Sequence, residues 1–142
     1  MAEMTRDEWR AFLRDPARPA MLATVRPDGR PHVAPIWIVL DDDDTVVFTT
    51  GASTVKGRAV QADPRVALCV DDDRPPFSYV LVEGSAEVSA DLDEMLLWAT
   101  RIGGRYMGED QAEAFGRRNA VEGELLVRVT PARVVTRKNI SD

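Results

Sequence analysis

The alternation of apolar and polar positions along the chain predicts a mainly β fold. Short apolar runs rich in β-branched residues are separated by turns of proline, glycine and aspartate, which is typical of antiparallel strands joined by hairpins. The expected strands span residues 20–25, 32–40, 45–50, 65–70, 77–89 and 124–135. Since helices do not alternate with these strands, the pattern argues against a parallel doubly wound sheet. It favours a six-stranded antiparallel sheet curled into a small barrel, with helices outside.

Helical signals flank and interrupt the strands. Thr5 and Glu8 have the spacing of a capping box, which predicts an N-terminal helix. The other expected helices span residues 53–61, 91–105 and 110–119. The last two form a helical insertion at about residues 91–119, and apolar residues recur at three- and four-residue spacing in the first of them. At this length we expect a single domain over residues 1–142.

Charge and composition narrow the class of partner. The chain of 142 residues is 44% hydrophobic and carries a net charge of −6 with a pI near 4.8. These values fit a globular protein and argue against nucleic acid or an anionic membrane surface as a partner. Cys69 is the single cysteine and cannot form an internal disulfide. The first residues lack the apolar core of a signal peptide, and no apolar run reaches the ~20 residues that span a bilayer. We therefore expect a cytoplasmic protein.

The stretch from Phe48 to Arg58 has the composition of an anion-binding site. An apolar strand breaks at Gly51 and runs into a helix start that carries Ser53, Lys56 and Arg58. Hydroxyls, free backbone N–H groups and two positive charges favour an anion, most often a phosphate. Because the chain as a whole is acidic, general basicity does not explain this cluster. An ordinary helix N-terminus with solvated Lys56 and Arg58 accounts for the same residues, so both interpretations stay open here.

Side chains that could do chemistry by themselves are scarce. His32 is the single histidine, which excludes a histidine-based metal cluster, and its place after a turn indicates a half-exposed structural role. The acidic runs at residues 41–44 and 71–73 lack the spacing of an EF-hand and are expected as solvated turns. We expect no metal site. No Gly-x-Ser-x-Gly, Walker A or Cys-x-x-Cys motif is present. A bound cofactor with a phosphate, which carries the chemistry itself, fits this combination.

Four motifs give the chain a family resemblance. They are LATVRPDGRPHVAPIW at residues 22–37, TTGASTVKGR at 49–58, DPRV at 63–66 and PPFSYVLVEGSAEV at 75–88. In the order and spacing of these motifs, the chain resembles the split β-barrel flavin-binding group related to pyridoxamine 5′-phosphate oxidase. Within that group it is most similar to the short members that bind the deazaflavin coenzyme F420.

The resemblance implies a fold, an assembly and a set of cofactor contacts. The fold would be a six-stranded antiparallel split barrel of the FMN-binding type, paired into a homodimer with two cofactor sites at the interface. One strand would lie along the ring system, residues 49–58 would hold the phosphate, and the loop before Phe77 would help to enclose the cofactor. The implied cofactor-binding residues are Val33, Pro35, Ile36, Trp37, Thr49, Thr50, Gly51, Ser53, Lys56, Arg58, Phe77 and Ser78.

Two departures from the family pattern bear on function. The family often has Arg-Asn where this chain has Arg58-Ala59, so one amide contact is lost. The chain also lacks the C-terminal extension that completes the substrate site of true pyridoxamine-phosphate oxidases, which argues against that activity.

The two cations of the anion segment raise a separate question. On a regular helix Lys56 and Arg58 project about 200° apart. Both meet one phosphate only if the helix starts late or Arg58 reaches back. Alternatively, Lys56 binds the phosphate and Arg58 binds a more distal anionic tail.

The function implied by the resemblance is oxidoreduction that depends on coenzyme F420, with hydride transfer from the reduced deazaflavin to an electron-poor small molecule. Tyr79 and Tyr106 are candidates for a proton donor, and no catalytic residue is assigned. An FMN-binding oxidase or reductase of the same fold and a non-catalytic cofactor carrier remain alternatives.

Overall fold

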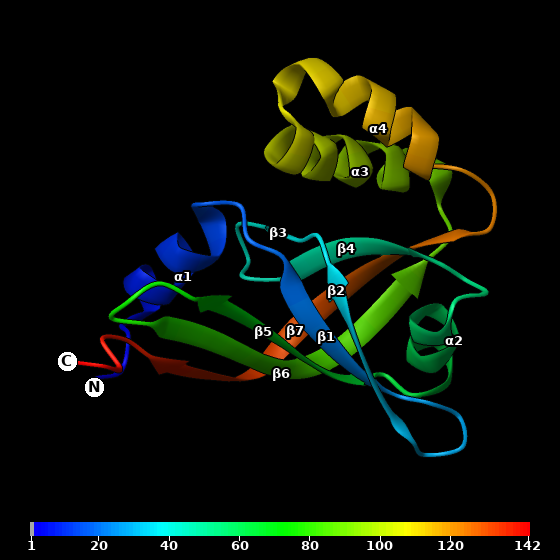
Figure 1. Ribbon diagram of the computed structural model, residues 1–142. Helices are drawn as coiled ribbons and strands as arrows, with labels where there is room; N and C mark the ends of the chain where they lie inside the picture. Colours follow the sequence, from blue (N-terminus) through cyan, green and yellow to red (C-terminus); the bar gives the residue numbers. More distant parts are fainter. Residues whose placement is uncertain (1) are drawn as a thin grey trace.

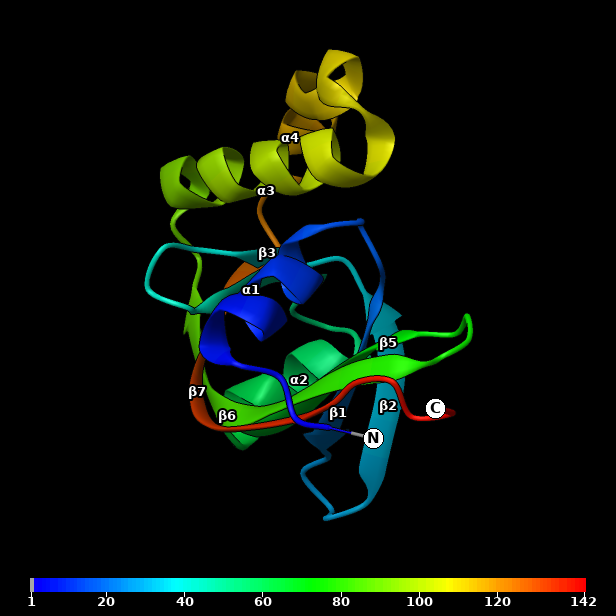
Figure 2. The same ribbon diagram turned by 90° about the vertical axis from the view of Figure 1, so that its left-hand side faces the viewer.

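An antiparallel sheet of seven strands forms the body of the computed structural model, which describes residues 2–142 (Figure 1). The strands are β1 (Ala20–Val25), β2 (Pro31–Ile36), β3 (Val39–Leu40), β4 (Val46–Gly51), β5 (Arg65–Asp72), β6 (Ser78–Ser89) and β7 (Glu124–Arg137). They follow the order β2-β1-β5-β6-β7-β4-β3 across the sheet. The long strands bend, so that the sheet curls around its own inner face (Figure 2). This confirms the expected mainly β split barrel with flanking helices.

Over the same residues, four α-helices and a 3₁₀ turn surround the sheet. They are α1 (Arg6–Arg14), α2 (Val55–Ala62), α3 (Leu92–Met107), η1 (Glu109–Gln111) and α4 (Ala112–Asn119). α1 and α2 lie at opposite ends of the curled sheet, and α3 and α4 form a stacked pair outside it (Figures 1 and 2). The N-terminal capping box is confirmed, because the Thr5 hydroxyl accepts the Glu8 N–H and the Glu8 carboxylate accepts the Thr5 N–H. None of these described helices is long and apolar enough to cross a membrane.

The expectation of six strands is wrong, because the strand expected at residues 32–40 is two strands. β2 pairs with β1 and β3 pairs with β4, on opposite edges of the sheet. Between them, the Ile38 N–H donates to the Tyr106 hydroxyl at 3.2 Å and the Ile38 carbonyl accepts from Arg105 at 2.8 Å. Side chains of α3 thus satisfy backbone groups that a continuous strand would pair with its neighbour. The apolar sequence from Ile36 to Leu40 does not reveal this break.

The core fills the inside of the curled sheet. Its largest fully buried side chains include Leu13, Leu22, Ile38, Phe48, Leu68, Val80, Val82 and Val127. A second, smaller cluster joins the helical insertion to the outer face of the sheet, where Met95 of α3 packs with Val47 and Leu126. Burial of a side chain of this size contributes roughly 1.5–3 kcal/mol. These contacts fix α3 on β4 and β7.

The acidic turn before β4 is not simply the solvated turn that the sequence predicts. Asp44 is only 9% exposed and adopts a positive φ of 65°. Its carboxylate lies 2.8 Å from Arg6 Nη2, in hydrogen-bond geometry, and 2.7 Å from Arg10 Nε, in a close ion pair without that geometry. Two arginines of α1 therefore hold this helix against the β3–β4 turn.

We expect Asp44→Asn to lower the free energy of unfolding by about 1–2 kcal/mol, because the amide keeps the shape of the side chain but loses its ion pairs with Arg6 and Arg10. Urea denaturation followed by circular dichroism measures this change. Asp43→Asn is the matched control, since Asp43 lies in the same turn but is exposed. Equal stability of the two variants would contradict the role of Asp44 in holding α1.

Candidate functional site

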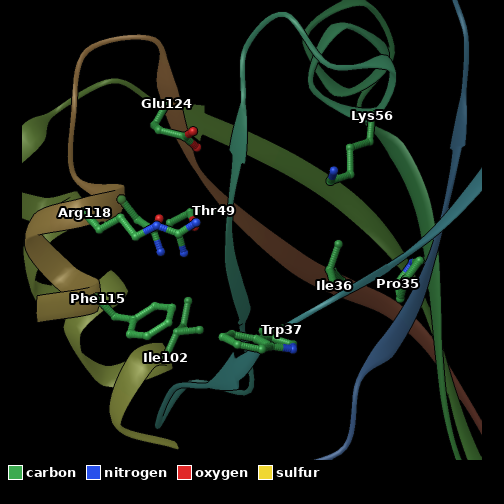
Figure 3. A pocket seen from close by; sticks show the side chains of 10 residues that line it. Pro35, Ile36, Trp37, Thr49, Lys56, Ile102, Phe115, Arg118 and Glu124 are labelled. Carbon is green, nitrogen blue, oxygen red and sulfur yellow. The ribbon is translucent and has the colours of Figure 1, made fainter. Parts of the chain in front are cut away.

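A cavity of about 420 Å³ lies where the curled sheet meets α2 and the helical insertion (Figure 3). β2, β4, α2, α3, α4 and the start of β7 each contribute to its wall. Its lining residues are Pro35, Ile36, Trp37, Thr49, Lys56, Ile102, Phe115, Arg118, Asn119 and Glu124. Lys56 and Glu124 lie at one end, on opposite walls, whereas Trp37 and Phe115 lie toward the other (Figure 3).

The cationic end of the cavity depends on a close approach between α2 and the end of β4. Thr54 caps α2: its hydroxyl accepts the Gly57 N–H at 3.0 Å and donates to the Gly51 carbonyl at 2.8 Å. A Cβ on Gly57 would lie 2.0 Å from that carbonyl oxygen, so only glycine permits the approach. The cap and Gly57 together place Lys56, on the first turn of α2, in the cavity wall.

The aromatic end is held by packing from α3. The rings of Trp37 and Tyr106 are stacked, with centroids 4.9 Å apart and planes 1° from parallel. The Tyr106 hydroxyl donates to the Arg18 carbonyl at 2.6 Å while it accepts the Ile38 N–H. Phe115 of α4 lies 6.0 Å from Trp37, tilted by 44°. Trp37 is therefore a fixed wall that is still 39% exposed.

Arg105 stabilises this arrangement through hydrogen bonds to two backbone carbonyls. It donates to the Ile38 carbonyl and, at 2.6 Å, to the Leu13 carbonyl, so one guanidinium joins α3, the strand break and α1. Burial lowers the pKa of Arg105 from its ordinary value. Because the ordinary value is far above neutrality, the guanidinium stays charged.

The charged groups that line the cavity are Lys56, Arg118 and Glu124. Burial raises the pKa of the Glu124 carboxyl above its ordinary value, and the positive charge of Lys56 acts in the opposite direction. Arg118 lies over the ring of Phe115, 5.5 Å from its centroid. Within residues 2–142, no group of three or more metal-ligating side chains is placed to hold a metal ion. This donor set suits an organic ligand that carries a phosphate and an aromatic ring.

The structure brings together only part of the predicted site. Of the predicted residues, those that line the cavity are Pro35, Ile36, Trp37, Thr49 and Lys56. Others adjoin it without lining it: Thr50 is buried beside Thr54, Gly51 ends β4, Ser53 is exposed before α2, and Val33 is 60% exposed on β2.

Phe77 and Ser78 lie elsewhere in the chain's fold. Phe77 ends the β5–β6 turn and Ser78 begins β6, at the end of the sheet opposite α2 (Figure 1). Ser78 lines a hollow beside α1, and Phe77 is 39% exposed. A role for these two residues at a cofactor site requires a second subunit, so it stays a prediction.

Arg58 and Lys56 are directed into different hollows. Arg58 lines a second hollow of about 310 Å³, together with Arg26 and Arg30 of the β1–β2 turn. This is the divergence that the helical repeat predicts for positions two residues apart. The interpretation in which Lys56 and Arg58 serve different anionic groups therefore stays a prediction.

Half of the residues that line the cavity were not predicted from the sequence. The missed residues are Ile102, Phe115, Arg118, Asn119 and Glu124. The amphipathic spacing of α3 indicates that Ile102 faces inward, but no local pattern indicates that the insertion brings Phe115 beside Trp37. Tyr106 was one of two candidate proton donors, yet its hydroxyl donates to the Arg18 carbonyl. Tyr79, on β6, does not line the cavity.

Comparison with known proteins supports a family assignment. The family model described as pyridoxamine 5′-phosphate oxidase matches residues 5–137. A pyridoxine/pyridoxamine 5′-phosphate oxidase of Rubrobacter xylanophilus is 34% identical over 91 residues, which are 62% of this chain and 40% of that protein. The chain thus spans less than half the length of this curated relative.

Two solved structures share nearly all of the fold. A conserved hypothetical protein of Mycobacterium tuberculosis, Rv2991, aligns with a TM-score of 0.84 and 25% identity over 97% of this chain and 87% of that one. A structure described as an F420 reductase aligns with a TM-score of 0.68 and 29% identity, over 87% of this chain and 94% of that one. At 97% coverage of this chain, the similarity to Rv2991 extends beyond the barrel to the helical insertion.

We expect Tyr106→Phe to lower the free energy of unfolding by about 1–3 kcal/mol, because it keeps the stack on Trp37 but leaves the Ile38 N–H and the Arg18 carbonyl without their partner. Chemical denaturation measures the change, and near-ultraviolet circular dichroism reports on the Trp37 environment. Tyr79→Phe is the control, since the Tyr79 hydroxyl makes no hydrogen bond within the described residues. A Tyr106→Phe variant as stable as this control would contradict the proposed support of the strand break.

Proposed function

Because the chain belongs to the pyridoxamine 5′-phosphate oxidase family, we propose that it is an oxidoreductase that uses the deazaflavin coenzyme F420 to reduce an electron-poor small molecule. The observation that carries this proposal is the cavity itself, which has a lysine at one end and a fixed tryptophan wall at the other (Figure 3). A deazaflavin has a matching polarity, with a ring system at one end of a polyol chain and a phosphate at the other. The similarity to an F420 reductase over most of both chains supports the choice of this cofactor.

The residues present fit such a group. Lys56 and the Thr49 hydroxyl offer a charge and a hydrogen bond to the phosphate. Pro35 and Trp37 offer a flat apolar surface to the ring. β2 is an edge strand of the sheet, so its outer backbone groups are free to donate to a ring carbonyl.

When bound, the reduced deazaflavin supplies the hydride that the protein's own side chains cannot supply. The chain's contribution is position: the Tyr106 stack and the Ile38 hydrogen bonds hold Trp37, and the Thr54 cap holds Lys56. Such fixed geometry matters for hydride transfer, because donor and acceptor must be held close and aligned. The helical insertion covers one side of the cavity and limits the entry of water from that side.

A homodimer is part of this proposal. Exposed apolar side chains on and beside the edge strand β2 include Met21, Val33 and Trp37, and Phe77 adds another at the β5–β6 turn. A second copy would cover them and would complete the cavity with its own β5–β6 turn. The predicted roles of Phe77 and Ser78 depend on this second copy.

Lys56→Ala should weaken binding of both F420 and FMN by roughly 10- to 100-fold, as expected for loss of a hydrogen bond to a charged group. Fluorescence titration of the purified protein with each cofactor measures the two dissociation constants. Arg58→Ala removes the same charge two residues away, in the separate hollow. We expect it to weaken only the tail-bearing F420 and to leave FMN within about threefold.

The outcomes of this titration separate the candidate functions. Tight F420 binding with weak FMN binding supports the deazaflavin reductase, and the reverse order supports an FMN enzyme. Cofactor binding with no turnover in a substrate screen supports a carrier. Unchanged affinity in Lys56→Ala for both cofactors would contradict the phosphate site.

Multi-angle light scattering tests the dimer, and we expect a mass of twice the 15.7 kDa chain. Val33→Asp should shift the protein toward the monomer, because it places a charge on the exposed face of β2. Val121→Asp is the matched control, since Val121 is also an exposed valine but lies in the loop before β7 and not on β2. A wild-type monomer at all working concentrations would rule out the interface site.

A further inference from the structure

Glu124 is a carboxylate at the phosphate end of the cavity. It is the first residue of β7 and pairs with Gly51, the last residue of β4. Its Oε1 lies 3.7 Å from the place of a Cβ on Gly51, so the side chain extends across the end of β4. Figure 3 shows it on the wall opposite Lys56. Within residues 2–142 its carboxylate makes no hydrogen bond and no ion pair shorter than 4 Å, and Lys56 acts on it only as a nearby charge across the cavity.

A carboxylate such as Glu124 is unexpected in a site that only binds phosphate. The cavity is lined by two cations, Lys56 and Arg118, and by this one carboxylate. An ionised Glu124 cancels one of the two positive charges and repels any anion that approaches Lys56. A site built only to hold the most negative ligand would not place a carboxylate there.

Phosphates of two kinds differ in charge near neutral pH. A phosphomonoester such as FMN carries about −1.5 to −2, because its second ionisation has a pKa near 6. A phosphodiester has no second ionisation and carries a single negative charge. F420, whose phosphate continues into a tail, is of the second kind. Two cations and one carboxylate give the cavity one net positive charge. This charge compensates the single negative charge of a phosphodiester but leaves the second charge of a monoester uncompensated.

We propose that Glu124 is a specificity-determining residue that makes the cavity favour a phosphodiester over a phosphomonoester, and so F420 over FMN. This inference rests on the proposed function, since it concerns the same cavity. It gives a structural reason, within this chain, for binding F420 in preference to FMN. The preference is weakest in acid, where the carboxyl and the monoester both gain protons.

The direct test compares the wild type with Glu124→Gln at pH 8, where a carboxylate and a monoester are both ionised. Glutamine keeps the size and shape of the side chain and removes only the charge. We expect the variant to bind FMN roughly tenfold more tightly, as repulsion between two close charges in a partly exposed site implies. F420 affinity should change by less than about threefold. Glu122→Gln is the matched control, because Glu122 is exposed in the loop before β7 and should alter neither affinity.

An equal change for both cofactors, or weaker FMN binding by Glu124→Gln, would overturn the inference. If the wild type binds neither F420 nor FMN, the proposed function fails, but the charge preference can still be measured. Ribose 5-phosphate and its methyl diester then serve as probes, followed through the Thr49 and Lys56 amide signals by NMR at pH 8. The inference predicts tighter binding of the diester by the wild type and loss of that preference in Glu124→Gln. Equal or tighter binding of the monoester by the wild type, or no response to either probe, would overturn it.

Discussion

The backbone of Ile38 is the point on which the rest of the site depends. Its N–H and its carbonyl are bound by Tyr106 and Arg105 of α3 instead of by a neighbouring strand. As a result, β2 ends before Ile38 and β3 pairs at the other edge of the sheet. Trp37 lies at the break between them, stacked on Tyr106. Because unpaired buried backbone groups cost about 1–3 kcal/mol each, the break could not persist without the insertion. The helical insertion is therefore part of the barrel's structure and not an appendage to it.

The second fixed element is the junction between β4 and α2, where a threonine cap and a glycine allow the helix to meet the strand end. The two elements lie at opposite ends of the cavity, one aromatic and one cationic, and each is held by hydrogen bonds. A ligand with a ring and a phosphate would thus meet two preformed surfaces, which reduces the ordering cost of binding. The lack of a histidine or cysteine nucleophile in the cavity fits a protein that positions a reactive cofactor.

The sequence predicted the fold well, because hairpin turns and alternating apolar residues are local signals. The capping box at Thr5, the helical insertion and the divergence of Lys56 and Arg58 all follow from short-range spacing. The strand break and the burial of Asp44 do not, since both depend on arginine and tyrosine side chains far away in the chain. For the same reason the sequence indicated the part of the cavity wall on β2, β4 and α2, whereas the part contributed by α3, α4 and β7 was missed.

The proposed binding site is one cavity with a cationic end at Lys56 and an aromatic end at Trp37. A crystal structure of the protein grown with F420 tests this most directly. We expect the phosphate to bind within hydrogen-bond distance of Lys56 Nζ and the deazaflavin ring to pack against Pro35 and Trp37. A phosphate bound instead in the arginine hollow beside Arg58, or a ring away from Trp37, would contradict it.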